Sequence, residues 1–165
     1  MKGSQEKTKS EDTKVRNKIY IGADSAGYTL KEELGTLLRQ WGYEVYDMGT
    51  DSTASCHYPE FAAAVCHGVL DSNGEAYGLL VCGTGIGMSM CANKFDGIRA
   101  AVVSDTFSAK MTRAHNDANV ICIGARVIGS CLAEELLRAF LETEFEGGRH
   151  AVRVDMMREI EEGKR

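Results

Sequence analysis

No apolar run in this 165-residue sequence approaches the roughly 20 residues that a helix needs to cross a bilayer. Positive charge is not in excess either, because the formal net charge is −5, and this balance argues against general affinity for nucleic acid. The sequence also has no internal repeat, no low-complexity segment and no domain linker. These absences predict one globular domain with no membrane or nucleic-acid partner.

Cysteines are present, but not at a spacing that binds metal. No Cys-x-x-Cys pair occurs, and Cys56-His57 and Cys66-His67 are adjacent pairs. A chain of this length buries a core without disulfides or a structural metal. We therefore expect a cytoplasmic protein with reduced thiols, no metal and no cofactor, in which cysteines other than Cys82 are small core residues. Residues 1–17 are polar and predict a flexible tail before one domain at 18–165.

Strand-like runs alternate regularly with helical patterns along the domain. The runs cover residues 18–22, 44–48, 77–82, 99–103 and 119–124, and the helical patterns cover 30–41, 60–71, 86–95, 106–113, 132–141 and 149–162. This order predicts an α/β protein with a three-layer α/β/α, Rossmann-like fold, in which helices cover both faces of a five-stranded parallel sheet and a C-terminal helix follows. Ligands bind such sheets beyond the carboxyl ends of the strands.

Cys82 stands where the third run gives way to the turn Gly83-Thr84-Gly85-Ile86-Gly87. Glycines leave backbone amides bare, and the N-terminus of the following helix favours negative charge. A thiol at such a position is favoured as a thiolate, which is a usable base or nucleophile. The turn therefore predicts chemistry on a small anionic substrate.

Two further polar segments are expected at the opposite, amino edge of the sheet. His115 and Asn116 follow the fourth helical pattern, and residues 146–150 follow the fifth. Within one subunit neither segment reaches Cys82, whereas a two-fold axis could bring them together. The order of elements thus predicts an active site shared between the subunits of a homodimer.

Several of these side chains also have simpler interpretations. Arg149 and Arg153 oppose the dipole of the last helix, and either a bound phosphate or surface carboxylates would relieve this repulsion. His115 could be a solvated loop residue, and Asp24 a helix cap. Arg126, after the last strand, is either a ligand-binding residue or part of a surface ion pair, and we favour the ion pair.

Taken together, these residues resemble the type B ribose-5-phosphate isomerases and their relatives, including the galactose-6-phosphate isomerase subunits. The resemblance runs from residue 18 to 160. The segments that carry it are Gly22-Ala23-Asp24, Tyr58-Pro59, Cys82 to Gly87, Ala92-Asn93-Lys94, Gly97 to Ala100, His115 to Asn119 and Glu146 to His150.

The resemblance implies an aldose–ketose isomerase that interconverts ribose 5-phosphate and ribulose 5-phosphate through a cis-enediolate. Cys82 would move the proton with help from Thr84, and His115, helped by Asp24, would open the sugar ring. The turn amides would hold the oxyanion. The implied substrate-binding residues are Ser25, Tyr58, Gly83, Gly85, Ile86, Gly87, Asn116, Arg113, Arg149 and Arg153. The implied assembly is a homodimer or a dimer of such dimers.

Two positions depart from the pattern of that family. Ser25 stands where a phosphate-binding histidine is common, and His57 stands where an aspartate usually precedes the tyrosine. Another sugar phosphate (allose, galactose or tetrose phosphate) and a non-catalytic sugar-phosphate-binding subunit therefore stay open. A dinucleotide-binding module is a weaker alternative, because Met88 occupies the place of the last glycine in that fingerprint.

Overall fold

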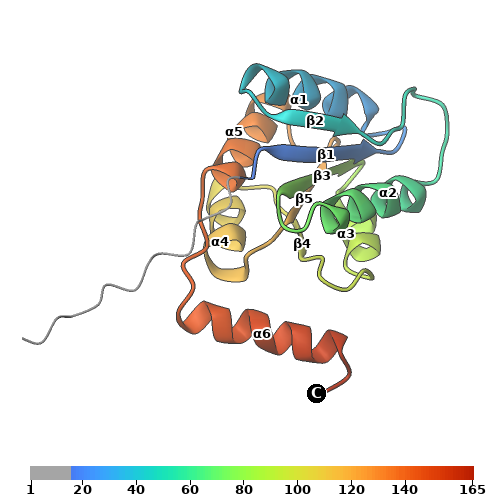
Figure 1. Ribbon diagram of the computed structural model, residues 1–165. Coiled ribbons are helices and arrows are strands. Elements are labelled where there is room, and N and C mark those ends of the chain that lie inside the picture. The colour runs from blue at the N-terminus through green and yellow to red at the C-terminus, as the bar shows by residue number, and fades with distance from the viewer. Residues whose placement is uncertain (1–15) are drawn as a thin grey trace, which may run out of the picture.

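Five parallel strands form the sheet, in the order β2-β1-β3-β5-β4 (Figure 1). They are β1 (Lys18–Ala23), β2 (Glu44–Asp47), β3 (Ala76–Cys82), β4 (Ala100–Val102) and β5 (Val120–Gly124). The computed structural model describes residues 16–165, so the first 15 residues of the predicted tail lie outside the described part. Asn17, the last residue of the predicted tail, already contacts the sheet, because its carbonyl accepts the Glu44 N–H at 2.9 Å.

Helices cover both faces of the sheet, which confirms the three-layer prediction (Figure 1). One face carries α1 (Tyr28–Gln40), α4 (Thr106–Asn116) and α5 (Ser130–Leu141), whose apolar residues form one core with Ile19, Ile21 and Leu79. The other face carries α2 (Tyr58–Asp71) and α3 (Ile86–Ala92), which pack with Leu80 and Cys122. Successive side chains along a strand point into these two cores in turn, as a sheet covered on both faces requires.

The central strand β3 is buried along its whole length. Leu79 and Val81 point to the α1, α4 and α5 side, whereas Leu80 and Cys82 point to the α2 and α3 side. Cys82 therefore ends the most enclosed strand of the sheet, at its carboxyl edge.

Two helices end about three residues away from the predicted position. The helix α4 continues to Asn116 rather than ending near residue 113, and it ends at Asp117, which has a left-handed backbone with φ of 46°. The helix α3 stops at Ala92, three residues early. There the Asn93 side chain bonds both the N–H and the carbonyl of Ala100, at 2.8 and 2.9 Å, and so ties the helix end to β4.

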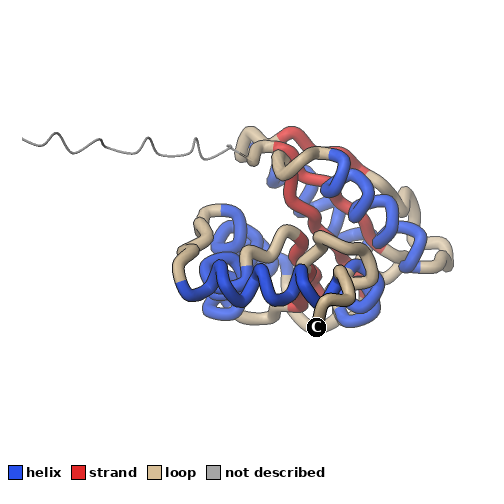
Figure 2. The backbone as a smooth tube through the Cα atoms, turned by 60° about the horizontal axis from the view of Figure 1, so that its bottom comes forward, coloured by secondary structure: helices blue, strands red, loops and turns tan. Residues whose placement is uncertain are grey.

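The C-terminal helix α6 (Arg149–Glu161) lies outside the two helical layers, as Figures 1 and 2 show. Only His150 and Val154 of this helix are buried. Val152, Met156 and Ile160 follow one another at intervals of four residues, so they share a face, and all three are exposed. No helix among residues 16–165 is long and apolar enough to span a membrane.

Candidate active site

The Cys82 thiol is held by the turn that follows it. Its Sγ accepts a hydrogen bond from the Gly85 N–H at 3.0 Å, and only 5% of the residue is exposed. Gly85 has φ of 78°, and a Cβ at this position would lie 3.1 Å from the backbone of Ile123. The turn thus needs a glycine here to bring its amide onto the sulfur.

Thr84 and Tyr58 lie beside the same turn. The Thr84 hydroxyl is exposed and accepts the Ile86 N–H at 3.3 Å. The Tyr58 ring lies against Gly87, where a Cβ would come within 2.9 Å of its Cζ atom. The structure therefore brings together the predicted residues of this turn and the tyrosine that begins α2.

Asp24 lies directly beside the end of β3, because its N–H donates to the Val81 carbonyl at 3.2 Å. Its Oδ1 accepts the N–H groups of Ala26 and Gly27, both at 2.9 Å. Both N–H groups precede α1, whose N-cap is Gly27 and carries no side-chain cap bond, so Asp24 stabilises the turn before the helix and the capping interpretation was wrong. Ser25, half-buried, follows at the same edge of the sheet.

Two more cysteines lie in the core that Cys82 joins. Burial raises the pKa of Cys66 to about 12, and burial also raises the pKa of Cys122 well above its usual value. These thiols stay protonated at neutral pH and serve as core residues, as predicted. The same prediction was wrong for Cys131, which is exposed on α5.

His115 lies at the opposite edge, in the last turn of α4. Its ring stacks on that of His150, with centroids 4.2 Å apart and planes 2° from parallel. One oxygen of Glu146 lies 3.9 Å from Nε2 of His115 and 3.6 Å from Nε2 of His150. The Glu146 N–H donates to the Ala114 carbonyl at 3.0 Å, so residues 146–150 are tied to the end of α4 as the sequence predicts. Burial lowers the pKa of His150, and the neighbouring His115 lowers it further.

Among the described residues, His115, Glu146 and His150 are of the types that bind metal ions, and their ligand atoms lie within 4.8 Å of one another. An imidazole binds a metal through a lone pair in the plane of its ring. Parallel stacked rings direct their lone pairs side by side rather than toward one point. The arrangement therefore fits stacked histidines near a carboxylate better than a metal centre.

The substrate-binding role that the resemblance implies for Arg113 needs correction. The side chain is 4% exposed, and Nη1 donates to Asp117 Oδ1 and to the Ala118 carbonyl, both at 2.7 Å. Its guanidinium also lies over the Tyr77 ring, 4.9 Å from the centroid. Arg113 is thus occupied inside the fold, where a guanidinium stacked on an aromatic ring is favourable.

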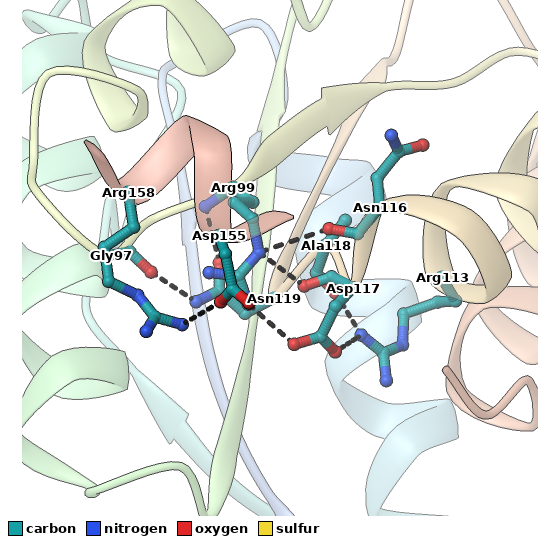
Figure 3. Close-up of polar contacts among 9 residues, drawn as sticks. All are labelled: Gly97, Arg99, Arg113, Asn116, Asp117, Ala118, Asn119, Asp155 and Arg158. Atoms are coloured by element: carbon teal, nitrogen blue, oxygen red, sulfur yellow. Dashed lines mark hydrogen bonds and ion pairs between the residues drawn. The ribbon is translucent and has the colours of Figure 1, made fainter. Parts of the chain in front are cut away.

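Asp117 joins Arg113 to a second arginine (Figure 3). Its Oδ2 accepts Arg99 Nη2 at 2.8 Å, and Arg99 Nε donates to the Asp117 and Asn116 carbonyls at 2.9 and 3.2 Å. The backbone just after His115 is therefore held between two guanidinium groups.

The exposed candidate residues Arg126, Arg149 and Arg153 have no carboxylate partner among residues 16–165. The surface ion pairs considered as alternatives for them are therefore not formed within this part of the chain. Arg126 follows β5 and lies against the Cys82 turn, with Nη1 3.6 Å from the position of a Cβ on Gly83. The surface ion pair favoured for Arg126 is thus absent from the described residues, and its place after the strand adjoining β3 was the available signal that it lies beside the turn.

The chain thus carries two separate groups of candidate residues. Around Cys82, at the carboxyl edge, lie Asp24, Ser25, Tyr58, Thr84 and Arg126. At the amino edge, the ends of α4 and α6 carry His115, Asn116, Arg149 and Arg153. Parallel strands separate the two groups within one subunit, as the order of elements predicts.

Proteins similar in sequence to this chain are named as sugar-phosphate isomerases. The model of the family Ribose/Galactose Isomerase matches residues 19–157. The chain is 44% identical to ribose-5-phosphate isomerase B of Escherichia coli over 145 residues, 88% of this chain and 97% of that protein. It is 47% identical to D-erythrulose-4-phosphate isomerase of Pectobacterium atrosepticum over 138 residues, 83% of this chain and 90% of that one.

Solved structures agree with the sequence relatives. Ribose-5-phosphate isomerase B of Clostridium thermocellum superposes with a TM-score of 0.86 at 45% identity, covering 90% of this chain and 99% of that one. The Mycoplasma genitalium enzyme with bound ribulose-5-phosphate gives 0.85 at 36% identity, covering 88% and 96%. By sequence and by fold, the chain belongs to the ribose/galactose isomerase family.

Proposed function

We propose that this protein is an isomerase that interconverts ribose 5-phosphate and ribulose 5-phosphate. The observation that carries the proposal is the bond from the Gly85 N–H to the Cys82 sulfur, in a chain of this family. A backbone donor at 3.0 Å stabilises a sulfur anion without a metal ion or a neighbouring cation. The thiolate is therefore the base of the reaction.

The reaction is a proton transfer between adjacent carbons. The Cys82 thiolate removes the proton from C2 of the open-chain aldose, and the electron pair moves through the C1–C2 bond to the aldehyde oxygen. The resulting cis-enediolate takes the same proton back at C1, while the proton between the two oxygens passes through the Thr84 hydroxyl. Amides of the turn at Gly83, Gly85, Ile86 and Gly87 stabilise the developing negative charge.

His115 opens the furanose ring before this transfer. Ring opening needs a donor for the ring oxygen and an acceptor for the C1 hydroxyl proton, and an imidazole supplies either near neutral pH. The Asp24 carboxylate lies at the other half of the site, where one oxygen holds the turn before α1 and the other is available to assist. Asn116, exposed beside His115, binds a sugar hydroxyl.

The two halves meet across a homodimer, either alone or in a dimer of dimers. The apolar face of α6, formed by Val152, Met156 and Ile160, is exposed. Four further exposed apolar residues, Ile86, Met90, Val102 and Phe107, lie on α3, β4 and α4, and α3 follows the Cys82 turn directly. A two-fold axis that places the first group on the second buries both and brings each α6 to the thiol of its partner. This geometry supports a composite site.

In such a site the phosphate lies between subunits. Arg149 and Arg153 of one copy bind it from α6, together with Ser25 and Arg126 of the other. None of these guanidiniums has a carboxylate partner in residues 16–165. Arg149 Nε donates to His150 Nε2 at 3.4 Å, which leaves its terminal nitrogens for an anion. Arg126 here takes the place assigned from the sequence to Arg113.

A four-carbon substrate is the second candidate. The relative from Pectobacterium atrosepticum named D-erythrulose-4-phosphate isomerase is 47% identical to this chain, slightly more than the ribose-5-phosphate isomerases compared here. The proton transfer at Cys82 would be the same. We also place the protein in the cytoplasm, because all six cysteines are free thiols.

The test is direct conversion followed by NMR. Purified protein is mixed with ribose 5-phosphate, and in parallel with D-erythrulose 4-phosphate, and product signals are recorded. Ribulose 5-phosphate formation at the higher kcat/KM supports the first candidate, and a higher value for the tetrose supports the second. Binding without turnover of either sugar overturns both and favours a non-catalytic subunit.

A further inference from the structure

The His115 ring lies flat on a buried neighbour that the proposed reaction does not use. His150 is 5% exposed, whereas the His115 side chain is 36% exposed. The stack joins the last turn of α4 to the first turn of α6. One face of His115 is therefore covered by a fixed ring, while its other face and its edge are open.

We propose that His150 is a positioning residue, which holds the imidazole of His115 in the orientation that opens the sugar ring. The inference rests on the proposed function of His115. A partly exposed histidine at a helix end is free to change rotamer, and a parallel ring 4.2 Å away removes much of that freedom. Orientation of a catalytic group decides how much of its chemistry is realised.

Glu146 completes this arrangement from the solvent side. Its carboxylate oxygen lies near Nε2 of both histidines, and its backbone is bonded to Ala114, one residue before His115. Both separations are longer than a hydrogen bond, and His150 Nε2 accepts from Arg149 Nε at 3.4 Å. The backbone bond to Ala114 therefore ties the segment that carries His150 to the end of α4, where the two rings lie 2° from parallel.

A simpler role for His150 is to anchor α6, and the chain offers a matched control for it. Val154 is the other buried residue of the helix, one turn further on, and 7% exposed. Val154→Ala loosens α6 without removing the stack. His150→Ala removes both the anchor and the stack, whereas His150→Phe keeps an aromatic ring and loses the nitrogens.

Two reactions separate ring opening from proton transfer. Ribose 5-phosphate is cyclic and must be opened, so its turnover depends on His115. Ribulose 5-phosphate cannot close a furanose, because its 5-hydroxyl is esterified. Deuterium incorporation at its C1 in D₂O therefore reports proton transfer at Cys82 alone.

We expect His150→Ala to lower kcat/KM for ribose 5-phosphate about 10- to 100-fold while C1 exchange stays within about twofold of wild type. His150→Phe should recover most of the lost turnover, and Val154→Ala should change both reactions by the same factor. Equal losses in both reactions for His150→Ala, or a His150→Phe variant as slow as His150→Ala, would overturn the inference.

A measurement that needs no turnover tests the role of His150 separately from the proposed function. Ring carbon and proton shifts of His115 are recorded by NMR in wild type and in the His150 variants. Loss of the ring-current shift and averaging of the His115 signals are expected in His150→Ala only. Unchanged His115 signals in His150→Ala contradict the positioning role of His150, whether or not the wild type isomerises sugars. An inactive wild type in which the His115 signals change as expected overturns only the proposed function.

Discussion

The Gly85 N–H donates to the Cys82 sulfur at 3.0 Å, across a turn of three residues. The donor belongs to the backbone, so it stays in place when neighbouring side chains change. The acceptor ends a strand buried on both sides. Removing the sulfur should therefore remove the chemistry and leave the binding surface intact.

We predict that Cys82→Ala lowers kcat for ribose 5-phosphate by about 10²–10⁴-fold or more, since loss of a positioned base costs this much. Calorimetric titration with the sugar phosphate should still give near-wild-type affinity. Cys131→Ala, at an exposed thiol, is the control and should behave as wild type. Substantial turnover by Cys82→Ala would remove the thiol from the mechanism.

A shared site predicts complementation between two inactive variants. When Cys82→Ala and His115→Ala subunits are mixed, unfolded and refolded together, half of the dimers are mixed. Each mixed dimer has one intact site, so about a quarter of the wild-type activity should return. No recovery, despite mixed dimers detected by mass, would mean that each subunit carries a complete site or that the two residues do not cooperate.

The arginines should divide into two classes by phenotype. Arg149→Ala and Arg126→Ala are expected to raise KM about tenfold and to leave the melting temperature near that of wild type. Arg113→Ala leaves the Asp117 carboxylate facing Arg99 alone, and breaking a buried ion pair costs about 3 kcal/mol or more. Thermal unfolding should show this loss as a clearly lower melting temperature. The reverse pattern would restore Arg113 to the phosphate site.

Thiol reactivity provides a check on the buried core. Because its pKa is raised to about 12, Cys66 is almost entirely protonated at pH 8, and Cys122 likewise. Iodoacetamide should leave both unmodified in the native protein and label them after denaturation, as read by peptide mass spectrometry. Loss of activity should follow the labelling of Cys82 and should be slowed by ribose 5-phosphate. Early labelling of Cys122 would show that this core opens readily.

The order of elements and the edges of the sheet were predictable from the sequence. Apolar runs and helical spacing placed the five strands, and parallel connections then fixed Cys82 and His115 at opposite edges. The strand order was not predictable, because periodicity does not say which strands are neighbours. Nor was the end of α4, where Asp117 adopts a left-handed backbone between two arginines that are 14 residues apart in sequence.

The assignment of the arginines also depended on tertiary contacts. Arg113 and Arg126 are both basic residues beside polar turns, and nothing in their spacing shows which is buried. The stack of Tyr77 below Arg113 joins residues 36 positions apart, whereas Arg126 lies against a glycine with no side chain to pair with. The sequence therefore predicted Arg149 and Arg153 of the proposed phosphate site, but it did not indicate Arg126 in place of Arg113.

The enclosure of β3 has a consequence for how such a protein acquires new substrates. A strand that is buried at all seven positions tolerates few changes of volume. The proposed place of proton exchange is therefore constrained, and a longer or shorter sugar must be admitted elsewhere. In the proposed shared site, the exposed segment between β2 and α2 and the amino end of α6 are the parts that tolerate change, so diversification would proceed at the rim while the thiol stays fixed.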